Sequence, residues 1–254
     1  MSDLIDGIFY SSLIRKNVPY RVLVPDTVSR TVEPIPVLYL LHGLFGSCEN
    51  WTELTDLQSY VGDADLLIAM PDGGDNWYTD SDEKYESYLI HDLIREIETR
   101  FGAAQERSRR AIAGNSMGGY GALKLALKFP AIFGFAASFS GAFHATRLLG
   151  ESDHGEIMPS ILRVFGEDHS RIRTDNDIFA IAALAGSNAD RLPGIYFDCG
   201  IGDEFITANR EFSLALFAAG IDHEFLEING GHDWPYWDDR IGHLVSILKQ
   251  RFSV

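Results

Sequence analysis

A short glycine-rich stretch, Gly114-Asn115-Ser116-Met117-Gly118, constrains this chain more than any other feature. A strand-like run over residues 110–113 precedes it, and a helix-like run over residues 121–128 follows it. A serine between small residues at a strand-to-helix junction predicts a sharp turn that exposes the hydroxyl at the C-terminal edge of a sheet. The N-terminus of the following helix would favour negative charge that develops there. Ser116 is therefore our candidate nucleophile, although glycine-rich turns also produce this pattern without any chemistry.

Two other kinds of glycine-rich loop are excluded at this position. A phosphate-binding loop requires lysine after its last glycine, whereas Tyr120 follows Gly119. A dinucleotide-binding fingerprint requires a glycine at its sixth place, and the run that begins at Gly119 has Lys124 there. The stretch therefore does not predict a nucleotide site.

Size and charge indicate a globular protein without a nucleic-acid partner. The 254 residues fall within the range of one large α/β domain, and 46% of them are hydrophobic. A formal net charge of −16 opposes binding to nucleic acid or to an anionic membrane, because no basic field would attract phosphate groups. No apolar run approaches the roughly 18 residues that a membrane span needs.

The two cysteines and the first residues bear on the compartment. Residues 1–14 mix charge with strand-like alternation and do not resemble a signal peptide. We therefore expect a soluble, cytoplasmic protein in which Cys48 and Cys199 are free thiols. Cys48 could act as a nucleophile, but a loop thiol without chemistry is the simpler interpretation.

Strand-like and helix-like segments alternate along most of the chain. Residues 8–14 and 20–24 are rich in β-forming residues and predict an antiparallel hairpin at a sheet edge. Apolar runs that predict strands covered on both faces lie at residues 37–41, 66–70, 135–139 and 195–197, with a further strand at 223–228. Helical spacing is found at residues 85–101, 123–127, 211–219 and 241–252. The alternation predicts an α/β fold with a mostly parallel, doubly wound sheet, whose ligands bind beyond the C-terminal strand ends.

Residues 143–192 do not fit this alternation. They contain no clear strand, and short amphipathic patches lie at residues 157–165 and 178–185. The segment is too long for a connecting loop. We therefore expect a helical cap, inserted over the site within a single domain that spans residues 1–254.

His232 is the candidate general base among the eight histidines. It follows the strand that ends at Ile228, and two glycines before it let the backbone turn sharply beside the site. Aromatic residues after it could wall the site off. A loop histidine with a purely structural hydrogen bond is the alternative. His144, His154 and His169 lie in the expected cap, where they could contact a substrate or simply be solvated.

Asp203 is the candidate acid that would orient the base. A serine hydroxyl needs a base within hydrogen-bond reach, and the base needs an orienting group. Asp203 lies past two glycines after the strand at residues 195–197, where a carboxylate can reach Nδ1 of His232. Glu204 is the nearest competitor, whereas Asp198 belongs to the strand and Asp233 adjoins the histidine.

Acyl chemistry also requires N–H donors for an oxyanion. The residue after the nucleophile, Met117, supplies one candidate. The loop that follows the strand at residues 37–41 contains His42-Gly43-Leu44, and the N–H of Leu44 is the second candidate. An ordinary turn would also explain His42-Gly43.

These motifs resemble an esterase family of the α/β-hydrolases that includes esterase D (S-formylglutathione hydrolase), tributyrin and acetyl esterases, feruloyl esterases and antigen 85 mycolyltransferases. The matching segments are His42-Gly43-Leu44 with Glu49-Asn50-Trp51, Pro71 to Tyr78, Gly114 to Leu123, Cys199-Gly200 with Asp203, and Gly231 to Trp234. The resemblance implies the α/β-hydrolase fold. It also assigns Ser116 as nucleophile, Asp203 as acid, His232 as base, and Leu44 and Met117 as oxyanion donors.

Details within the family favour the small esterases. The Trp77-Tyr78 loop resembles that of tributyrin-type enzymes. S-formylglutathione hydrolases typically carry Ser-Gly in place of His42-Gly43 and histidine in place of Asn115 and Tyr120. The mycolyltransferases are secreted, whereas residues 1–14 of this chain do not resemble a secretion signal.

We therefore expect a serine carboxylesterase that hydrolyses short-chain acyl esters through an acyl-enzyme, without a cofactor or a metal ion. Its partner would be a small-molecule ester, and the family resemblance allows a homo-oligomer. The candidate substrate-binding residues are Phe143, Leu148, Phe165, Trp234 and Trp77. The loop at residues 72–78 is explained equally well as a structural turn. The alternatives are an S-formylglutathione-type thioesterase, a feruloyl or acetyl-xylan esterase and an acyltransferase, with a non-catalytic binding protein the least favoured.

Overall fold

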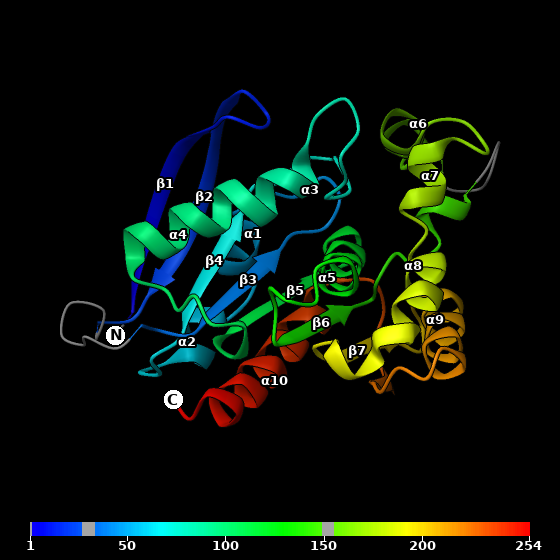
Figure 1. Cartoon of the computed structure of the whole chain (residues 1–254). Helices are drawn as coiled ribbons and strands as arrows, with labels where there is room; N and C mark the ends of the chain where they lie inside the picture. The colour runs from blue at the N-terminus through cyan, green and yellow to red at the C-terminus, as the bar shows by residue number, and fades with distance from the viewer. Residues whose placement is uncertain (1, 27–33, 149–154) are drawn as a thin grey trace.

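The computed structural model describes residues 2–26, 34–148 and 155–254, and an open sheet lies at its centre (Figure 1). The sheet has eight strands in the order β1-β2-β4-β3-β5-β6-β7-β8. The strands are β1 (Asp3–Ser11), β2 (Lys16–Val24), β3 (Val37–Leu41), β4 (Leu67–Pro71), β5 (Arg110–Asn115), β6 (Phe135–Phe139), β7 (Gly194–Gly200) and β8 (Glu224–Ile228). β2 pairs antiparallel with β1 and β4, and every other pair is parallel. The predicted edge hairpin and mostly parallel sheet are confirmed.

Helices connect the parallel strands and cover both faces of the sheet. They are α1 (Asn50–Glu53), α2 (Leu57–Val61), α3 (Tyr85–Ser87), the π-helical turn η2 (Tyr88–Leu93), α4 (Ile94–Phe101), α5 (Met117–Lys128), α6 (Met158–Phe165), α7 (Arg171–Asp175), α8 (Ile178–Ala185), α9 (Ile206–Ala218) and α10 (Trp234–Phe252). Short 3-10 turns occupy Arg107–Arg109, Ala145–Arg147 and Gly186–Arg191. None of the helices in the described ranges combines the length and apolarity needed to cross a bilayer.

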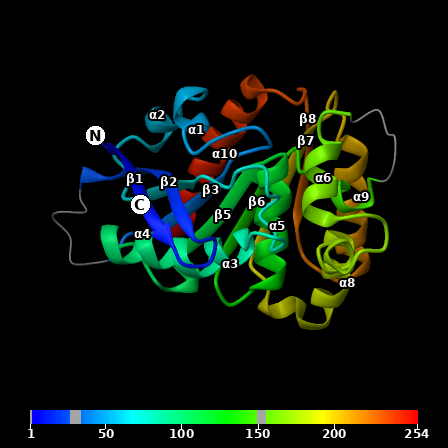
Figure 2. The same ribbon diagram turned by 90° about the horizontal axis from the view of Figure 1, so that it is seen from above.

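The continuously apolar strands separate two hydrophobic cores. Alternate side chains of a strand point to opposite faces, so β3 contributes Leu38 and Leu40 to one core and Tyr39 and Leu41 to the other. The first core packs under α1, α2 and α10, and the second under α4, α5, α8 and α9. Figure 2 shows these two helical layers on either side of the sheet. Burial on both faces explains why these strands lack polar alternation.

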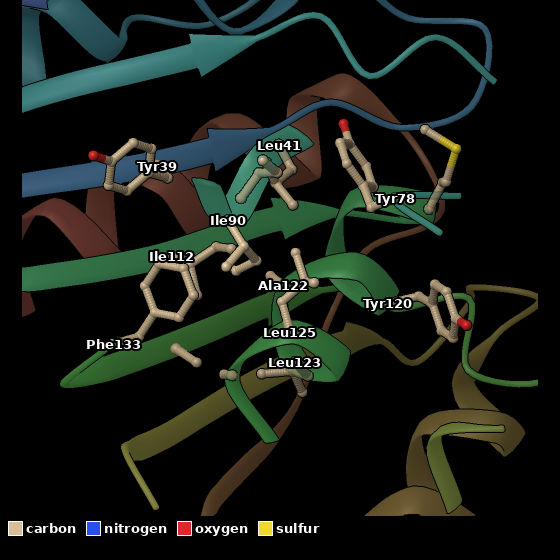
Figure 3. Close-up of a cluster of buried hydrophobic side chains, with 14 of the residues drawn as sticks. Tyr39, Leu41, Tyr78, Ile90, Ile112, Tyr120, Ala122, Leu123, Leu125 and Phe133 are labelled. Carbon is tan, nitrogen blue, oxygen red and sulfur yellow. The ribbon is translucent and has the colours of Figure 1, made fainter. Parts of the chain in front are cut away.

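Helix α5, which begins directly after Ser116, is enclosed on all sides. Every residue from Met117 to Leu127 is buried. Figure 3 shows Leu41 and Ile112 of the strands on the side of this helix that carries Ala122. Such packing holds the N-terminus of α5 in a fixed position at the sheet edge.

Several element boundaries differ from those that the sequence predicts. The helix expected over residues 85–101 is interrupted by the π-helical turn. Helix α10 begins at Trp234 rather than residue 241, because Asp233 caps it by accepting a hydrogen bond from the Tyr236 N–H, and a proline occupies its first turn. Apolar spacing reports the buried face of a helix and therefore missed this capped first turn.

The described part of the segment expected as a cap contains helices α6, α7 and α8 and no strand. The buried guanidinium of Arg173 joins its pieces, donating to the carbonyl oxygens of Thr146 (2.7 Å), Leu148 (3.0 Å) and Gly166 (2.7 Å). Helix α8 contacts α5 and α9, so this segment is anchored to helix α5, which begins directly after Ser116. Residues 149–154, which include His154, lie outside the described residues.

Candidate active site

Ser116 occupies a strained turn between β5 and α5. Its backbone has φ 52° and ψ −116°, a region that non-glycine residues rarely adopt. The Ser116 N–H donates to the Phe139 carbonyl oxygen (2.9 Å), and the Ser116 carbonyl oxygen accepts from the N–H groups of Tyr120 (3.0 Å) and Ala142 (3.1 Å). The neighbouring strand and the first turn of the helix therefore hold the unusual conformation from both sides.

The flanking glycines are required by close backbone contacts. A Cβ atom on Gly118 would lie 2.5 Å from the Leu41 carbonyl oxygen. A Cβ atom on Gly114 would lie 2.6 Å from the carbonyl carbon of Gly118. Neither distance is tolerated between real atoms, so the turn can close only with glycine at both positions.

The structure brings Ser116, His232 and Asp203 together in a hydrogen-bonded chain. His232 Nε2 lies 3.0 Å from Ser116 Oγ, and His232 Nδ1 lies 3.0 Å from Asp203 Oδ2. The other carboxylate oxygen of Asp203 accepts the Phe205 N–H at 2.8 Å. Burial alone raises the pKa of Asp203, but hydrogen bonds to the charged carboxylate, led by that of His232, outweigh it and hold the pKa below its usual value. The carboxylate therefore stays ionised beside the imidazole.

Aromatic rings fix the orientation of the His232 imidazole. Phe205 and Trp237 contact it edge-on, with ring centroids 4.8 and 4.9 Å away. Gly230, two residues earlier, packs so closely on the Tyr236 ring that a Cβ atom would lie 2.2 Å from it. The glycine predicted to let the backbone turn thus lets the histidine loop lie flat against the start of α10.

The predicted oxyanion donors, Met117 and Leu44, both lie near Ser116. Met117 is the first residue of α5, so its N–H has no partner within the helix. Leu44 lines the same cleft as Ser116. The preceding residue, Gly43, passes so near Ser116 that a Cβ atom on it would lie 3.5 Å from Ser116 Cβ. Both amides are therefore within the immediate surroundings of the serine hydroxyl.

A cleft of about 750 Å³ opens over Ser116 and His232. The remaining residues that line it are Gly43, Leu44, Phe45, Gly46, Asn50, Trp77, Asn115, Gly155, Glu156, Ile157, Glu204, Phe205, Trp234 and Trp237. A side chamber of about 80 Å³ shares four of these residues and is further lined by Ala142, His144, Ala145, Leu148, Thr207 and Ala208. The volume and the aromatic lining are typical of a small-molecule site.

Three of the five residues predicted to bind substrate lie at these surfaces. Trp234 lines the cleft, Leu148 lines the side chamber, and Trp77 lines both. Phe143 and Phe165 do not line either space and are fully buried.

Phe143 and Phe165 instead support the walls from behind. The Phe143 ring packs against Phe212, with centroids 4.5 Å apart, and the Phe165 ring lies 5.8 Å from the ring of Trp77. An aromatic residue in an apolar segment has the same pattern in a core as in a cavity wall, so the sequence could not distinguish the two.

The residues that were alternatives to Asp203 as the acid, or to Ser116 as the nucleophile, lie elsewhere or have other contacts. Asp198 is fully buried and accepts hydrogen bonds from the hydroxyls of Tyr196 and Tyr236, both at 2.7 Å. Asp233 caps α10, and Glu204 lines the cleft. Cys48 does not fit a nucleophile, because burial raises the pKa of its thiol to about 12.

The loop before α3 carries a second strained segment. Trp77 and Tyr78 have φ values of 53° and 47°, although neither is glycine. The indole N–H of Trp77 donates to Ser160 Oγ of α6 at 3.0 Å, and the Tyr78 carbonyl oxygen accepts from Lys124 Nζ of α5 at 2.8 Å. Both side chains are buried, but Trp77 lines the cleft and Tyr78 does not, so the loop combines the two interpretations that the sequence allows.

Sequence reasoning missed two residues that shape this site. Phe205 lines both the cleft and the side chamber. It follows the candidate acid Asp203 by two positions, and an aromatic residue so close to Asp203 is the signal in the sequence that could have identified it. Lys124 is fully buried and also binds Thr79 Oγ1 (2.7 Å), Asn176 Oδ1 (3.0 Å) and Glu86 Oε2 (3.0 Å). A lysine among apolar helical residues gives no local sign of such distant partners.

Known proteins resemble this chain over most of its length. The family described as "Putative esterase" matches residues 11–245. An acetyl esterase from Caldicellulosiruptor saccharolyticus is 30% identical over 256 residues, which cover 95% of this chain and 96% of that protein. The solved structure of FphF, a fluorophosphonate-binding serine hydrolase of Staphylococcus aureus, superposes with a TM-score of 0.87 at 25% identity and covers 97% of this chain and 98% of that one.

A second Staphylococcus aureus structure, the S-formylglutathione hydrolase FrmB, gives a TM-score of 0.83 at 25% identity and covers 98% of this chain and 99% of that one. These likenesses extend over the sheet, the helices on both faces and the segment that carries α6 to α8. The chain belongs to the "Putative esterase" family and is a carboxylic ester hydrolase with the α/β-hydrolase fold.

Proposed function

We propose that this protein is a serine carboxylesterase that hydrolyses short-acyl esters, with Ser116, His232 and Asp203 as its catalytic triad. One observation carries the proposal. Ser116 occupies a strained turn at an open cleft, and His232 lies 3.0 Å from both the Ser116 hydroxyl and the Asp203 carboxylate. This is the geometry in which an imidazole can accept the hydroxyl proton while a carboxylate stabilises the resulting charge.

The reaction proceeds in two steps at this site. His232 Nε2 takes the Ser116 proton as Oγ attacks the ester carbonyl, and the N–H groups of Leu44 and Met117 bind the oxyanion that forms. The intermediate collapses, the alcohol leaves with the proton from His232, and an acyl-Ser116 ester remains. Water, activated by the same imidazole, then releases the acid. Each oxyanion donor contributes about 3 kcal/mol of transition-state stabilisation.

The side chamber supports a short acyl group. Its wall residue Ala142 donates its N–H to the Ser116 carbonyl oxygen, which places the chamber beside the nucleophile. A volume of about 80 Å³ corresponds to only two or three water-sized groups. An acetyl to butyryl chain fits this volume. The described part of residues 143–192 would act as a cap beside the chamber, within a single domain that spans residues 1–254.

The main cleft would hold the alcohol portion. Trp234 and Trp237 offer flat apolar faces to a ring or a sugar, and Glu156 and Glu204 add carboxylates. Among the described residues that line this cleft there is no lysine or arginine. The lining therefore favours neutral or cationic alcohols over the anionic glutathione moiety of a thioester.

Labelling at Ser116 tests the proposal. A fluorophosphonate should modify Ser116, as peptide mass spectrometry will show, and Ser116→Ala should lose both the label and the hydrolysis of p-nitrophenyl acetate. Ser246→Ala, which removes an exposed hydroxyl on α10, is the matched control and should behave as wild type. Labelling of another residue, or an active Ser116→Ala protein, would contradict the assignment.

A substrate panel separates the alternatives within the family. The rate constant kcat/KM should fall as the acyl chain lengthens from acetate to octanoate. The similarity to an S-formylglutathione hydrolase makes its thioester the second substrate to measure. If that thioester is hydrolysed more efficiently than every oxygen ester, the thioesterase alternative replaces our proposal.

A further inference from the structure

The side chain of His42 is buried beside the oxyanion loop, yet no step of the proposed reaction uses it. We propose that His42 is a positioning residue: its imidazole locks the Gly43–Leu44 peptide in the orientation that directs the Leu44 N–H at the oxyanion. This inference rests on the proposed function, because it concerns the donor that the hydrolysis of an ester would need.

The hydrogen bonds of His42 assign its tautomer. The Gly73 N–H donates to His42 Nε2 at 2.8 Å, so Nε2 must be the unprotonated acceptor. His42 Nδ1 lies 2.7 Å from the Gly43 carbonyl oxygen, which can only accept, so Nδ1 carries the hydrogen and donates it. Burial lowers the pKa of His42 and outweighs the opposing effects of the Gly43 carbonyl and Asp72, which keeps the ring neutral.

The geometry of a trans peptide converts this bond into an orientation for Leu44. The Gly43 carbonyl oxygen accepts from His42 Nδ1 and also from the Gly46 N–H at 3.1 Å. In a planar trans peptide, the carbonyl oxygen and the following N–H point in opposite directions. Fixing the carbonyl on the side of His42 therefore turns the Leu44 N–H away from His42. Leu44 itself lines the cleft that contains Ser116.

A glycine at this position makes such a lock necessary. Glycine rotates easily about its backbone bonds, so the peptide after Gly43 could flip and present its carbonyl to the oxyanion instead. The two preceding carbonyl oxygens are each held by an aromatic side chain, Leu41 by the Trp51 indole N–H (3.1 Å) and His42 by the Tyr78 hydroxyl (3.0 Å). The imidazole extends this series to the carbonyl of the peptide whose N–H faces the cleft.

Two substitutions of His42 should each keep one of the two hydrogen bonds that the imidazole makes and remove the other. In His42→Asn, the side-chain amide N–H can occupy the place of Nδ1 and hold the Gly43 carbonyl. In His42→Gln, the amide reaches only the place of Nε2 and keeps the bond to Gly73. We expect kcat on p-nitrophenyl acetate to fall about 100-fold in His42→Gln with KM within about threefold, the effect of one lost oxyanion donor. His42→Asn should keep kcat within about fivefold of wild type.

Two further measurements separate the lock from a merely structural role. Rates are divided by the number of sites titrated with fluorophosphonate, so they refer to folded enzyme only. A trifluoromethyl ketone, which forms a tetrahedral adduct with a serine, should lose affinity for His42→Gln by the same factor as kcat/KM. Tyr78→Phe, which frees the neighbouring carbonyl, should lower Tm but leave kcat within about threefold, because no donor to the oxyanion moves.

The proposal is overturned if both His42 variants keep the wild-type kcat, or if both lose it equally in proportion to their loss of Tm. It is supported if only the variant that frees the Gly43 carbonyl loses kcat and affinity for the ketone. Failure of the proposed function would look different: the Ser116→Ala protein would keep its activity, whatever the His42 variants do.

Discussion

Ser116 and Trp77 face the same cleft, but the backbone holds the first in place and side chains hold the second. Strand pairing aligns Asn115 with Phe139, and Phe139 with Asp198, so the ends of β5, β6 and β7 meet beside Ser116. Trp77 instead depends on a hydrogen bond to Ser160, 83 positions away in the chain.

Charged side chains also hold the loop that carries Trp77. The loop that carries Trp77 is tied to the nucleophile helix by Lys124 and to α6 by Arg163, which donates to Asn76 Oδ1 at 2.7 Å. A chemical centre built on strand ends keeps its shape when surface residues vary. A wall built on distant side chains can change without disturbing the sheet. We therefore expect substitutions in the two regions to have different consequences, the first for the rate of chemistry and the second for the choice of acyl group.

The largest effect is expected from Asp203→Asn, on the side of Ser116. The amide cannot stabilise the charged imidazole and favours the wrong tautomer of His232, so kcat should fall about 10³- to 10⁴-fold. Steady-state kinetics on p-nitrophenyl acetate measure this loss, and thermal unfolding checks that Tm changes little. A variant that retains more than about a tenth of the wild-type kcat would exclude Asp203 as the acid.

Gly118→Ala tests the close approach of α5 to β3. The added methyl group would lie 2.5 Å from the Leu41 carbonyl oxygen, so helix and strand must separate. We expect a loss of about 3 kcal/mol in the free energy of unfolding, together with a large loss of kcat. Gly220→Ala is the control, since Gly220 has a positive φ of 71° but no atom within 4 Å of the new methyl group. Its cost should be about 1 kcal/mol, from backbone strain alone and without an effect on kcat.

Lys124→Met tests the loop that carries Trp77, which side chains of other helices hold in place. It removes the ammonium that binds the Tyr78 carbonyl and, among the residues that the structure describes, leaves Glu86 with Lys128 as its ionic partner. Breaking a buried ion pair of this kind should cost about 3 kcal/mol of stability. The preference for acetate over octanoate should weaken, while the rate of fluorophosphonate labelling stays near that of wild type. If labelling slows as strongly as hydrolysis, the two regions are not independent.

The smallest effect concerns Asp198. Its carboxylate binds the Tyr196 and Tyr236 hydroxyls on the Ser116 side of the cleft, where backbone hydrogen bonds otherwise hold the structure. Burial raises its pKa from an ordinary 3.8 to about 6. Between these values the folded protein binds more protons than the unfolded chain, so this group's contribution to stability falls as the pH rises from about 4 to about 6. Asp198→Asn should remove this dependence, which amounts to at most about 3 kcal/mol. Urea unfolding of both proteins at several pH values measures it, and parallel curves would exclude the assignment.

The sequence predicted the Ser116 side of the cleft better than the Trp77 side for a physical reason. Strand ends, glycines and capping residues are local signals, and the register of a parallel sheet then brings Ser116, Asp203 and His232 to one edge. The chamber wall depends on how deep each side chain lies, which no local pattern reports. This is why Leu148 lies at the chamber but Phe143 lies behind it.

The same limit applies to helix boundaries and buried charges. The start of α10 depends on a cap at Asp233 and a proline, signals that were present but lie outside the apolar repeat. The partners of Lys124 come from three other segments of the chain, and only the folded structure reveals that they converge. Local patterns therefore suffice for the alternation of strands and helices along the chain and for the turn at Ser116. They fail wherever tertiary contacts select among equivalent residues.

The left-handed pair Trp77-Tyr78 limits how this enzyme could be redesigned. Two bulky residues in that conformation hold roughly 1–3 kcal/mol of strain each, which their surroundings must compensate. A loop transplanted from a relative would bring its own turn but not Lys124, Ser160 and Arg163, which lie on other helices. If this loop selects the acyl group as we propose, exchanging the loop alone should not transfer the preference. Residues on α5 and α6 would have to be transferred with it.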